Sequence, residues 1–270
     1  MSSVGCLNVG HLKTNGWTVV NGVLSEDQVR TSRRDFGEWL HGNDGASSLG
    51  HSKMMWKLRL HPGVQALFRF IWSCDATESL ITSFDGCHVS RGTFFHVDAI
   101  SSSTRKLPST SWGAKNVKGA VNLYDSDVDD ACLYILKGSH VYYDEFFRVH
   151  EHEWAQQSRG ECFRLTQAHI RWFELKGCIR TPVHVTAGSV TLWDSRVVYC
   201  THPERRLTAF LCMMPRRLCS ASVLKRRKKL ALENRTTGNW PNRPRVKPIK
   251  TLREKGVSYL MKDAACFKLV

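Results

Sequence analysis

The sequence predicts a mainly β protein with flanking helices, an α+β fold in which short strands form a barrel or a double-sheet jelly roll. Two observations lead to this class. A helical pattern lies near the N-terminus, and beyond Thr82 the chain becomes a series of short runs rich in β-branched and aromatic residues, separated by turn signals. Many short strands after an N-terminal helical region favour paired or closed sheets that carry helices on one side.

The N-terminal region predicts a turn and a strand, followed by two helices. Residues 7–24 contain the run Trp-Thr-Val-Val between two glycines, which is typical of a short bounded strand. Ser25 and Gln28 form a capping box, so a helix is expected from there to Leu40. A second helix is expected around residues 64–71.

The rest of the chain predicts seven short strands and one long polar connection. The polar stretch at residues 101–111 lies between two predicted strands, and it is either a mobile lid or a long surface loop. The predicted strands are Thr93–Val97, Gly119–Tyr124, Ala131–Leu136, Pro182–Val185, Ser189–Trp193, Arg196–Cys200 and Leu207–Met214.

Composition excludes several classes of protein. The hydrophobic fraction of 42% and the charged fraction of 23% are ordinary for a globular chain, and no apolar run approaches the ~20 residues that cross a bilayer. No apolar segment follows a positive one at the start, so no secretory signal is expected. Ten scattered cysteines without a CxxC pair then predict reduced thiols and no structural zinc, in a cytoplasmic or nuclear protein.

Positive charge is concentrated near the C-terminus. The chain has a net charge of +15, and residues 203–255 carry sixteen Lys and Arg against three acidic residues, a net +13. We therefore expect one nearly neutral domain over residues 1–218 and a basic extension over residues 219–270. The run Lys225–Lys229 is either a nucleic-acid patch or one face of a solvated helix. Scarcity of aromatic residues in this region argues against stacking on single strands.

A candidate metal site begins with His96 and Asp98 at the end of a predicted strand. Side chains two apart on a strand point to the same face, so both can reach one ion. A bare His-x-Asp match is common by chance, so the third ligand matters. The best candidate is His202, on a distant strand. Two His and one carboxylate on one face leave three open positions, the arrangement of non-haem Fe(II) oxygenases.

A candidate cosubstrate site follows the third metal residue. A terminal carboxylate needs a guanidinium fork and a neighbouring hydroxyl on one face. Arg206 and Thr208 are two apart and meet this requirement, whereas Arg205 falls on the other face. We therefore expect Arg206 and Thr208 to bind 2-oxoglutarate, the alternative being that both arginines simply belong to the basic arm.

Several short motifs follow one another along the chain. They are the strand and helix of residues 12–40, Ser83–Gly86, His96–Asp98, Gly119–Leu123, Lys137–His140, Ala187–Arg196, Met213–Arg216 and Arg235–Pro241. Together and in this order they resemble the phytanoyl-CoA dioxygenase-like (PhyH) family of Fe(II)- and 2-oxoglutarate-dependent oxygenases, in its divergent branch from fungi and large DNA viruses. The resemblance implies a double-stranded β-helix (jelly-roll, cupin-like) core, and it makes residues 1–218 the oxygenase domain.

The family pattern differs from this chain at the distal metal ligand. Relatives have the distal His where this chain has Tyr199, and His202 comes three residues later. An offset of three residues along a strand turns the His202 side chain to the face opposite that of position 199. A β-bulge before Pro203 could turn it back toward His96 and Asp98. The third ligand is therefore His202, the phenolate of Tyr199, or absent.

Three functions follow from these features. The leading hypothesis is a dioxygenase that hydroxylates a C–H bond while 2-oxoglutarate and O2 give succinate and CO2, as in the family that the sequence resembles. The alternatives are a catalytically inactive β-helix that binds a partner, suggested by Tyr199, and an oxygenase acting on nucleic acid through the basic arm. The sequence does not name the substrate, because pocket residues come from loops that no motif defines.

Overall fold

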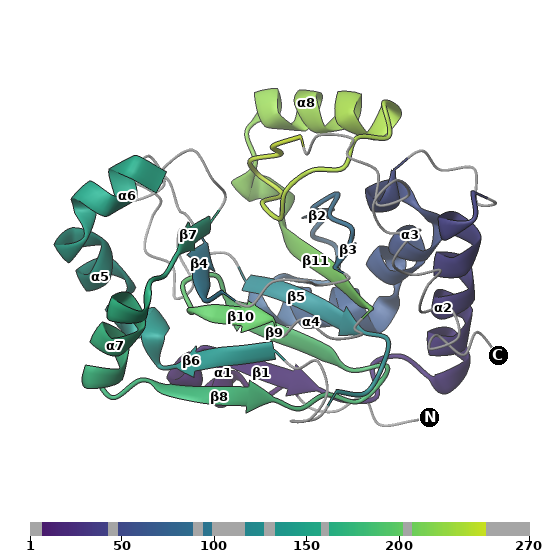
Figure 1. Cartoon of the computed structure of the whole chain (residues 1–270). Helices are drawn as coiled ribbons and strands as arrows, with labels where there is room; N and C mark the ends of the chain where they lie inside the picture. The colour runs from purple at the N-terminus through teal and green to yellow at the C-terminus, as the bar shows by residue number, and fades with distance from the viewer. Residues whose placement is uncertain are drawn as a thin grey trace. The chain divides into compact units, whose positions relative to one another are not determined.

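The computed structural model describes residues 7–42, 48–88, 94–98, 117–126, 133–157, 162–201 and 207–246 (Figure 1). The chain divides into two compact units, one from residues 1–21 and 88–208 and the other from residues 22–87 and 209–270. The boundary expected at residue 218 rests on charge in the sequence, and it stays a prediction.

The first unit contains two antiparallel sets of strands. In one set β9 pairs with β1 on one side and β5 on the other, and in the other the order is β7-β4-β10-β6-β8 (Figure 1). The strands are β1 (Trp17–Val20), β4 (His96–Asp98), β5 (Val117–Asn122), β6 (Leu133–Lys137), β7 (Cys162–Arg164), β8 (Ile179–Val183), β9 (Val190–Asp194) and β10 (Tyr199–Thr201).

Helices of the first unit were largely absent from the sequence prediction. A turn was expected where α1 forms, and no helix was expected between β6 and β8, where the described residues form three α-helices and one 3-10 turn. Asn8 caps α1, and Gly16 ends it in the left-handed conformation at φ +88°. The helices are α1 (Val9–Asn15), the short 3-10 turn η3 (Ser139–Tyr142), α5 (Tyr143–Val149), α6 (Glu151–Gln157) and α7 (Gln167–Leu175).

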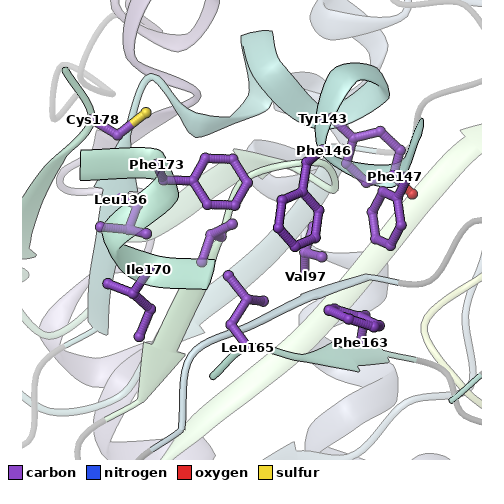
Figure 2. Close-up of a cluster of buried hydrophobic side chains, with 11 residues drawn as sticks. Val97, Leu136, Tyr143, Phe146, Phe147, Phe163, Leu165, Ile170, Phe173 and Cys178 are labelled. Carbon is purple, nitrogen blue, oxygen red and sulfur yellow. The ribbon is translucent and has the colours of Figure 1, made fainter. Parts of the chain in front are cut away.

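An aromatic core joins these helices to one face of the β7-β4-β10-β6-β8 sheet. Phe146 of α5 stacks on Phe173 of α7 with ring centroids 4.9 Å apart. Figure 2 shows these rings beside Val97 of β4 and Phe163 of β7. Val198, next to Tyr199 in the chain, is a member of the same cluster. Because neighbours along a strand point to opposite faces, the residues flanking Val97 and Val198 face away from these helices.

The second unit packs helices with a few strands. Its first helix begins at the predicted capping box, in which the Gln28 N–H donates to Ser25 Oγ and the Ser25 N–H donates to Gln28 Oε1. β11 pairs with β2 and β3. The elements are α2 (Glu26–Leu40), η1 (Leu49–His51), α3 (Lys53–Leu60), α4 (Pro62–Ile71), β2 (Leu80–Thr82), β3 (Cys87–His88), β11 (Thr208–Pro215), η4 (Arg216–Leu218) and α8 (Ala221–Leu232).

Every strand predicted beyond Thr82 has a counterpart in the structure, with ends displaced by a few residues. One such displacement is at β10, which begins at Tyr199 rather than at Arg196. Asp194 causes this shift, because it accepts hydrogen bonds from the backbone N–H and the guanidinium of Arg196 and so holds a turn there.

Candidate metal and cosubstrate site

His96 and Asp98 lie on the same face of β4, as the sequence predicted. Val97 between them belongs to the aromatic core, so both polar side chains face away from the helices. Asp98 is buried, whereas His96 is partly exposed. The Nδ1 atom of His96 lies 3.3 Å from the carbonyl oxygen of Phe94. A carbonyl oxygen only accepts, so Nδ1 of the neutral ring carries the proton and Nε2 carries the lone pair that a metal takes.

Tyr199 stands directly opposite His96. The two residues are register partners on β10 and β4, and their ring centroids are 4.2 Å apart. Tyr199 therefore occupies the position from which a distal ligand would meet His96 and Asp98. His202 lies outside the described residues, and its part in the site stays a prediction.

Lys118 of β5 completes the group. Its ammonium forms an ion pair with the Asp98 carboxylate, and it donates to the Tyr199 hydroxyl at 3.2 Å. Trp193, the register partner of Lys118 on β9, packs against the Tyr199 ring at 5.5 Å. Lys118, Asp98 and Tyr199 thus form a buried polar group between the two sets of strands of the first unit.

The protonation states of this group follow from burial and charge. Burial alone lowers the pKa of the Lys118 ammonium, but the Asp98 carboxylate and Tyr199 more than offset it, so the net shift is upward. Burial, assisted by the Asp98 carboxylate, raises the pKa of the Tyr199 phenol. At neutral pH Lys118 is therefore an ammonium and Tyr199 a neutral phenol, so Tyr199 is not a phenolate in this arrangement.

Lys118 was missed by the sequence analysis. The run Val-Lys-Gly-Ala-Val-Asn of β5 is buried throughout, and Lys118 is only 3% exposed. A lysine inside an otherwise apolar strand was the available signal, because an ammonium is rarely buried without a partner. Its partner could not be read from the sequence, since the contact joins two different sheets.

One predicted cosubstrate residue is described and the other is not. Thr208 begins β11 and is buried, and its hydroxyl has no hydrogen-bond partner among the described residues. A buried hydroxyl without a hydrogen bond destabilises the fold, and a bound ligand that carries an acceptor oxygen removes this penalty. Arg206 lies outside the described residues.

His140 has a structural role. Its Nε2 lies 2.9 Å from the Lys13 carbonyl oxygen, and its ring packs against Gly16, where an added Cβ would lie 2.8 Å from Nδ1. Gly16 in turn accepts a hydrogen bond from the Asp194 N–H at 2.9 Å. These contacts join α1, β9 and η3 and leave the imidazole outside the group around Asp98.

A second group with metal-ligand chemistry lies on the helices. Potential ligand atoms of His150, Glu153 and His169 all lie within 4.8 Å of one another. However, the Thr166 N–H donates to His169 Nδ1 at 3.1 Å, so the ring proton sits on Nε2 and points at Glu153 Oε2, 2.9 Å away. That nitrogen offers no lone pair to a metal. Glu153 is thus a hydrogen-bond acceptor that ties α6 to α7.

The basic run lies on α8 of the second unit. Arg227 is buried, donates to the carbonyl oxygens of Pro241 and Thr82, and lies over the Phe84 ring at 4.6 Å. Four other cationic side chains of the run are exposed, namely Lys225, Arg226, Lys228 and Lys229. The run is therefore part of a helix whose one buried cation is structural.

A known family matches this chain over most of its length. The family model of phytanoyl-CoA dioxygenase (PhyH) matches residues 12–206. The chain belongs to the phytanoyl-CoA dioxygenase family. The resemblance inferred from the ordered motifs is thereby confirmed. The matched region includes His96, Asp98, Lys118 and Tyr199, so the whole polar group lies within it.

One relative from a fungus matches part of the chain. The chain is 27% identical over 198 residues to Ava biosynthesis cluster protein O of Aspergillus versicolor, a match that covers 67% of this chain. The match spans 60% of the length of that relative.

Solved structures confirm the fold, which consists of antiparallel sheets with flanking helices and a double-stranded β-helix core. EctD from S. alaskensis in its apo form has a TM-score of 0.51 at 13% identity, covering 80% of this chain and 79% of that one. The non-haem α-ketoglutarate-dependent carbocyclase SnoK from nogalamycin biosynthesis has a TM-score of 0.50 at 17% identity, covering 77% and 83%. A non-haem monooxygenase, the ThoJ–Ni complex, has a TM-score of 0.51 at 10% identity, covering 77% of each chain.

Among the described residues, no helix has the length and apolar character needed to cross a membrane.

Proposed function

We propose that this chain is a non-haem Fe(II)- and 2-oxoglutarate-dependent dioxygenase whose metal is held by His96 and Asp98. The observation that carries the proposal is their shared face on β4, opposite the face that packs on the aromatic core. Membership of the phytanoyl-CoA dioxygenase family supports it, because family members use this metal and this cosubstrate.

The described residues fit an Fe(II) ion in two respects. An imidazole with its lone pair on Nε2 and a carboxylate are two of the three donors of the usual facial set. The carbonyl oxygen of Phe94 orients the imidazole, which is a common arrangement around metal-bound His. The third donor is assigned to His202, with Tyr199 or no third protein ligand as the alternatives.

The cosubstrate is assigned to residues 206 and 208, which belong to the same unit as His96 and Asp98. We place the far carboxylate of 2-oxoglutarate against the Arg206 guanidinium and the Thr208 hydroxyl. The buried hydroxyl of Thr208, which lacks a partner among the described residues, supports this assignment because a carboxylate oxygen satisfies it. Bound together, Fe(II) and 2-oxoglutarate supply the activation of O2 that hydroxylates a C–H bond, with succinate and CO2 as co-products.

The protein's own contribution is a buried and oriented polar group. Asp98 and Tyr199 are buried, so water is largely excluded around them. Trp193 and His96 both pack against the Tyr199 ring, which holds the phenol in place. We infer a small organic substrate, since the relative from Aspergillus versicolor is named for a biosynthesis cluster.

A second candidate function is a binding protein without metal. The ion pair of Lys118 with Asp98 favours it, because one expected metal ligand already has a cationic partner. Tyr199 also favours it, since the motif resemblance implies a distal His at this position. A third candidate keeps the enzyme and gives it a nucleic-acid substrate, which the exposed cations at residues 225–229 support. Replacing the four exposed cations with Ser should then lower the salt slope of binding, and an unchanged slope excludes this candidate.

Succinate formation distinguishes the first two candidates. Wild type with Fe(II), ascorbate, O2 and 2-oxoglutarate should form succinate slowly even without its substrate. His96→Ala should reduce this rate at least about a hundredfold, since an oriented metal ligand is lost. His152→Ala, an exposed His in the same unit, serves as the matched control and should retain the wild-type rate. Absence of succinate above the metal-free background in wild type favours the binding protein.

A further inference from the structure

Lys118 is positioned to compete with a divalent cation. Its ammonium contacts the Asp98 carboxylate, the group that the proposed function assigns to Fe(II). Both side chains are almost completely buried, at 4% and 3% exposure. A carboxylate in this setting needs a cationic or hydrogen-bonding partner, and Lys118 supplies one from within the chain.

Several contacts hold the Lys118 side chain in its position. Its ammonium also donates to the Tyr199 hydroxyl at 3.2 Å and lies 5.5 Å from the centre of the same ring. The strand itself is held by a register that pairs Lys118 with Trp193. Trp193 packs on the Tyr199 ring, and the Tyr199 hydroxyl accepts from Lys118, so the ammonium is held next to Asp98.

We propose that Lys118 is an internal counter-cation of Asp98 that competes with the divalent metal, so that the site binds metal only when the ammonium is displaced. This inference rests on the proposed function, because it takes Asp98 as a metal ligand. Removing the positive charge relieves both the competition for the carboxylate and the repulsion between two cations. Metal affinity therefore increases when Lys118 is neutralised.

The opposite expectation holds if Lys118 only supports the structure. A supporting residue keeps Asp98 and Tyr199 in place, so its removal loosens the site and weakens metal binding or leaves it unchanged. The direction of the change therefore separates the two roles, and the readout is metal binding rather than turnover.

The experiment measures the affinity of the full chain for Mn(II), with free Mn(II) quantified by electron paramagnetic resonance. Lys118→Met keeps the length of the side chain without its charge, and we expect the dissociation constant to fall at least about tenfold below that of wild type. Lys118→Gln keeps a donor toward Asp98 and should shift affinity in the same direction, which preserves the test if the Met variant does not fold.

Two controls complete the design. Lys176→Met removes another paired lysine of the same unit, whose Nζ lies 2.6 Å from Glu145 Oε1, and it should leave Mn(II) affinity at the wild-type value. Adding Asp98→Asn to Lys118→Met should abolish the gain, since the ligand is lost.

The outcomes separate this inference from the proposed function. Equal or weaker Mn(II) binding by both Lys118 variants, with wild-type binding that depends on Asp98, overturns the inference and leaves the dioxygenase proposal intact. If neither wild type nor the Lys118 variants bind Mn(II) in an Asp98-dependent way, Asp98 is not a metal ligand, and both fail.

Discussion

Lys118 and Asp98 form a buried ion pair that joins β5 to β4, two strands that belong to different sets of the first unit. The pair places a positive charge next to the residue that a metal would use. The choice between a metal enzyme and a metal-free binding protein therefore depends on whether a metal ion can displace the Lys118 ammonium from Asp98.

Breaking this pair should lower the unfolding free energy of the metal-free protein. Asp98→Asn leaves the Lys118 ammonium without its carboxylate, and an unpaired buried charge costs about 3 kcal/mol of unfolding free energy. The double variant with Lys118→Met removes both charges and should recover most of that loss. Urea unfolding measures both values. If Asp98→Asn lowers the unfolding free energy no more than a surface substitution does, the ion pair is not a buried, stabilising contact.

Tyr199→His combined with Lys118→Met should create a stronger metal site than either change alone. Tyr199 faces His96 with ring centroids 4.2 Å apart, so an imidazole at this position supplies the distal donor while the competing charge is removed. Mn(II) titration should give a dissociation constant at least about tenfold below that of Lys118→Met alone. No additional gain means that position 199 does not face the metal.

Thr208→Val tests the assignment of the cosubstrate. The Thr208 hydroxyl lacks a partner among the described residues, so a Val of nearly the same shape should leave the unfolding free energy unchanged or raise it slightly. Affinity for 2-oxoglutarate should fall about tenfold, because a hydrogen bond to a charged carboxylate is lost. Unaltered affinity for 2-oxoglutarate removes Thr208 from the site.

Gly16→Ala should destabilise the first unit more than Gly138→Ala. Both glycines have positive φ, at +88° and +83°, so each Ala costs about 1 kcal/mol for the backbone alone. At Gly16 an added Cβ also lies 2.3 Å from Val197 and 2.8 Å from His140, whereas nothing lies within 4 Å of that at Gly138. Thermal unfolding should rank the two variants in this order, and equal losses contradict the packing around Gly16.

Stability should fall as pH drops from 7.5 to 5. Burial is the main cause that lowers the pKa of His51, His61 and His169 below 6.5. Between the lowered and the ordinary pKa the unfolded chain binds more protons than the folded one, so the unfolding free energy rises with pH in this window. Carboxylates whose pKa is lowered, such as Glu153, stabilise the fold while ionised, and this contribution to the unfolding free energy is lost only below the pH window of the histidines.

His51→Gln isolates one of these groups. His51 Nε2 lies 3.2 Å from the Arg235 carbonyl oxygen, a contact that a Gln amide can replace without titrating. Urea unfolding at the two pH values should show a smaller loss for the variant than for wild type. If the unfolding free energies of the variant and wild type depend on pH in the same way, His51 has the same pKa in the folded and unfolded states, which contradicts the prediction.

Local signals predicted much of the fold. Ser25 and Gln28 specified the start of α2 because a capping box uses only neighbouring residues. The short strands followed from β-branched and aromatic runs. By contrast, α5 and α7 were missed because they have only seven and nine residues, and helices this short depend on tertiary packing, here the core around Phe146 and Phe173.

The site was predictable in part for the same reason. His96 and Asp98 share a face by the period of a strand, which is a local property. Lys118 and Tyr199 become neighbours only when β4, β10 and β5 are assembled, so their contact with Asp98 depends on tertiary structure. Spacing along the chain carries no information on such a contact.

The charge-transfer band of an Fe(II)–2-oxoglutarate complex tests the central claim most directly. Anaerobic titration of wild type with both components should produce a metal-to-ligand charge-transfer band in the visible range, and His152→Ala should produce the same band. His96→Ala should abolish it, because the imidazole ligand on β4 is lost. A band that is absent in wild type, or equally strong in His96→Ala, contradicts the assignment of His96 and Asp98 as the metal site.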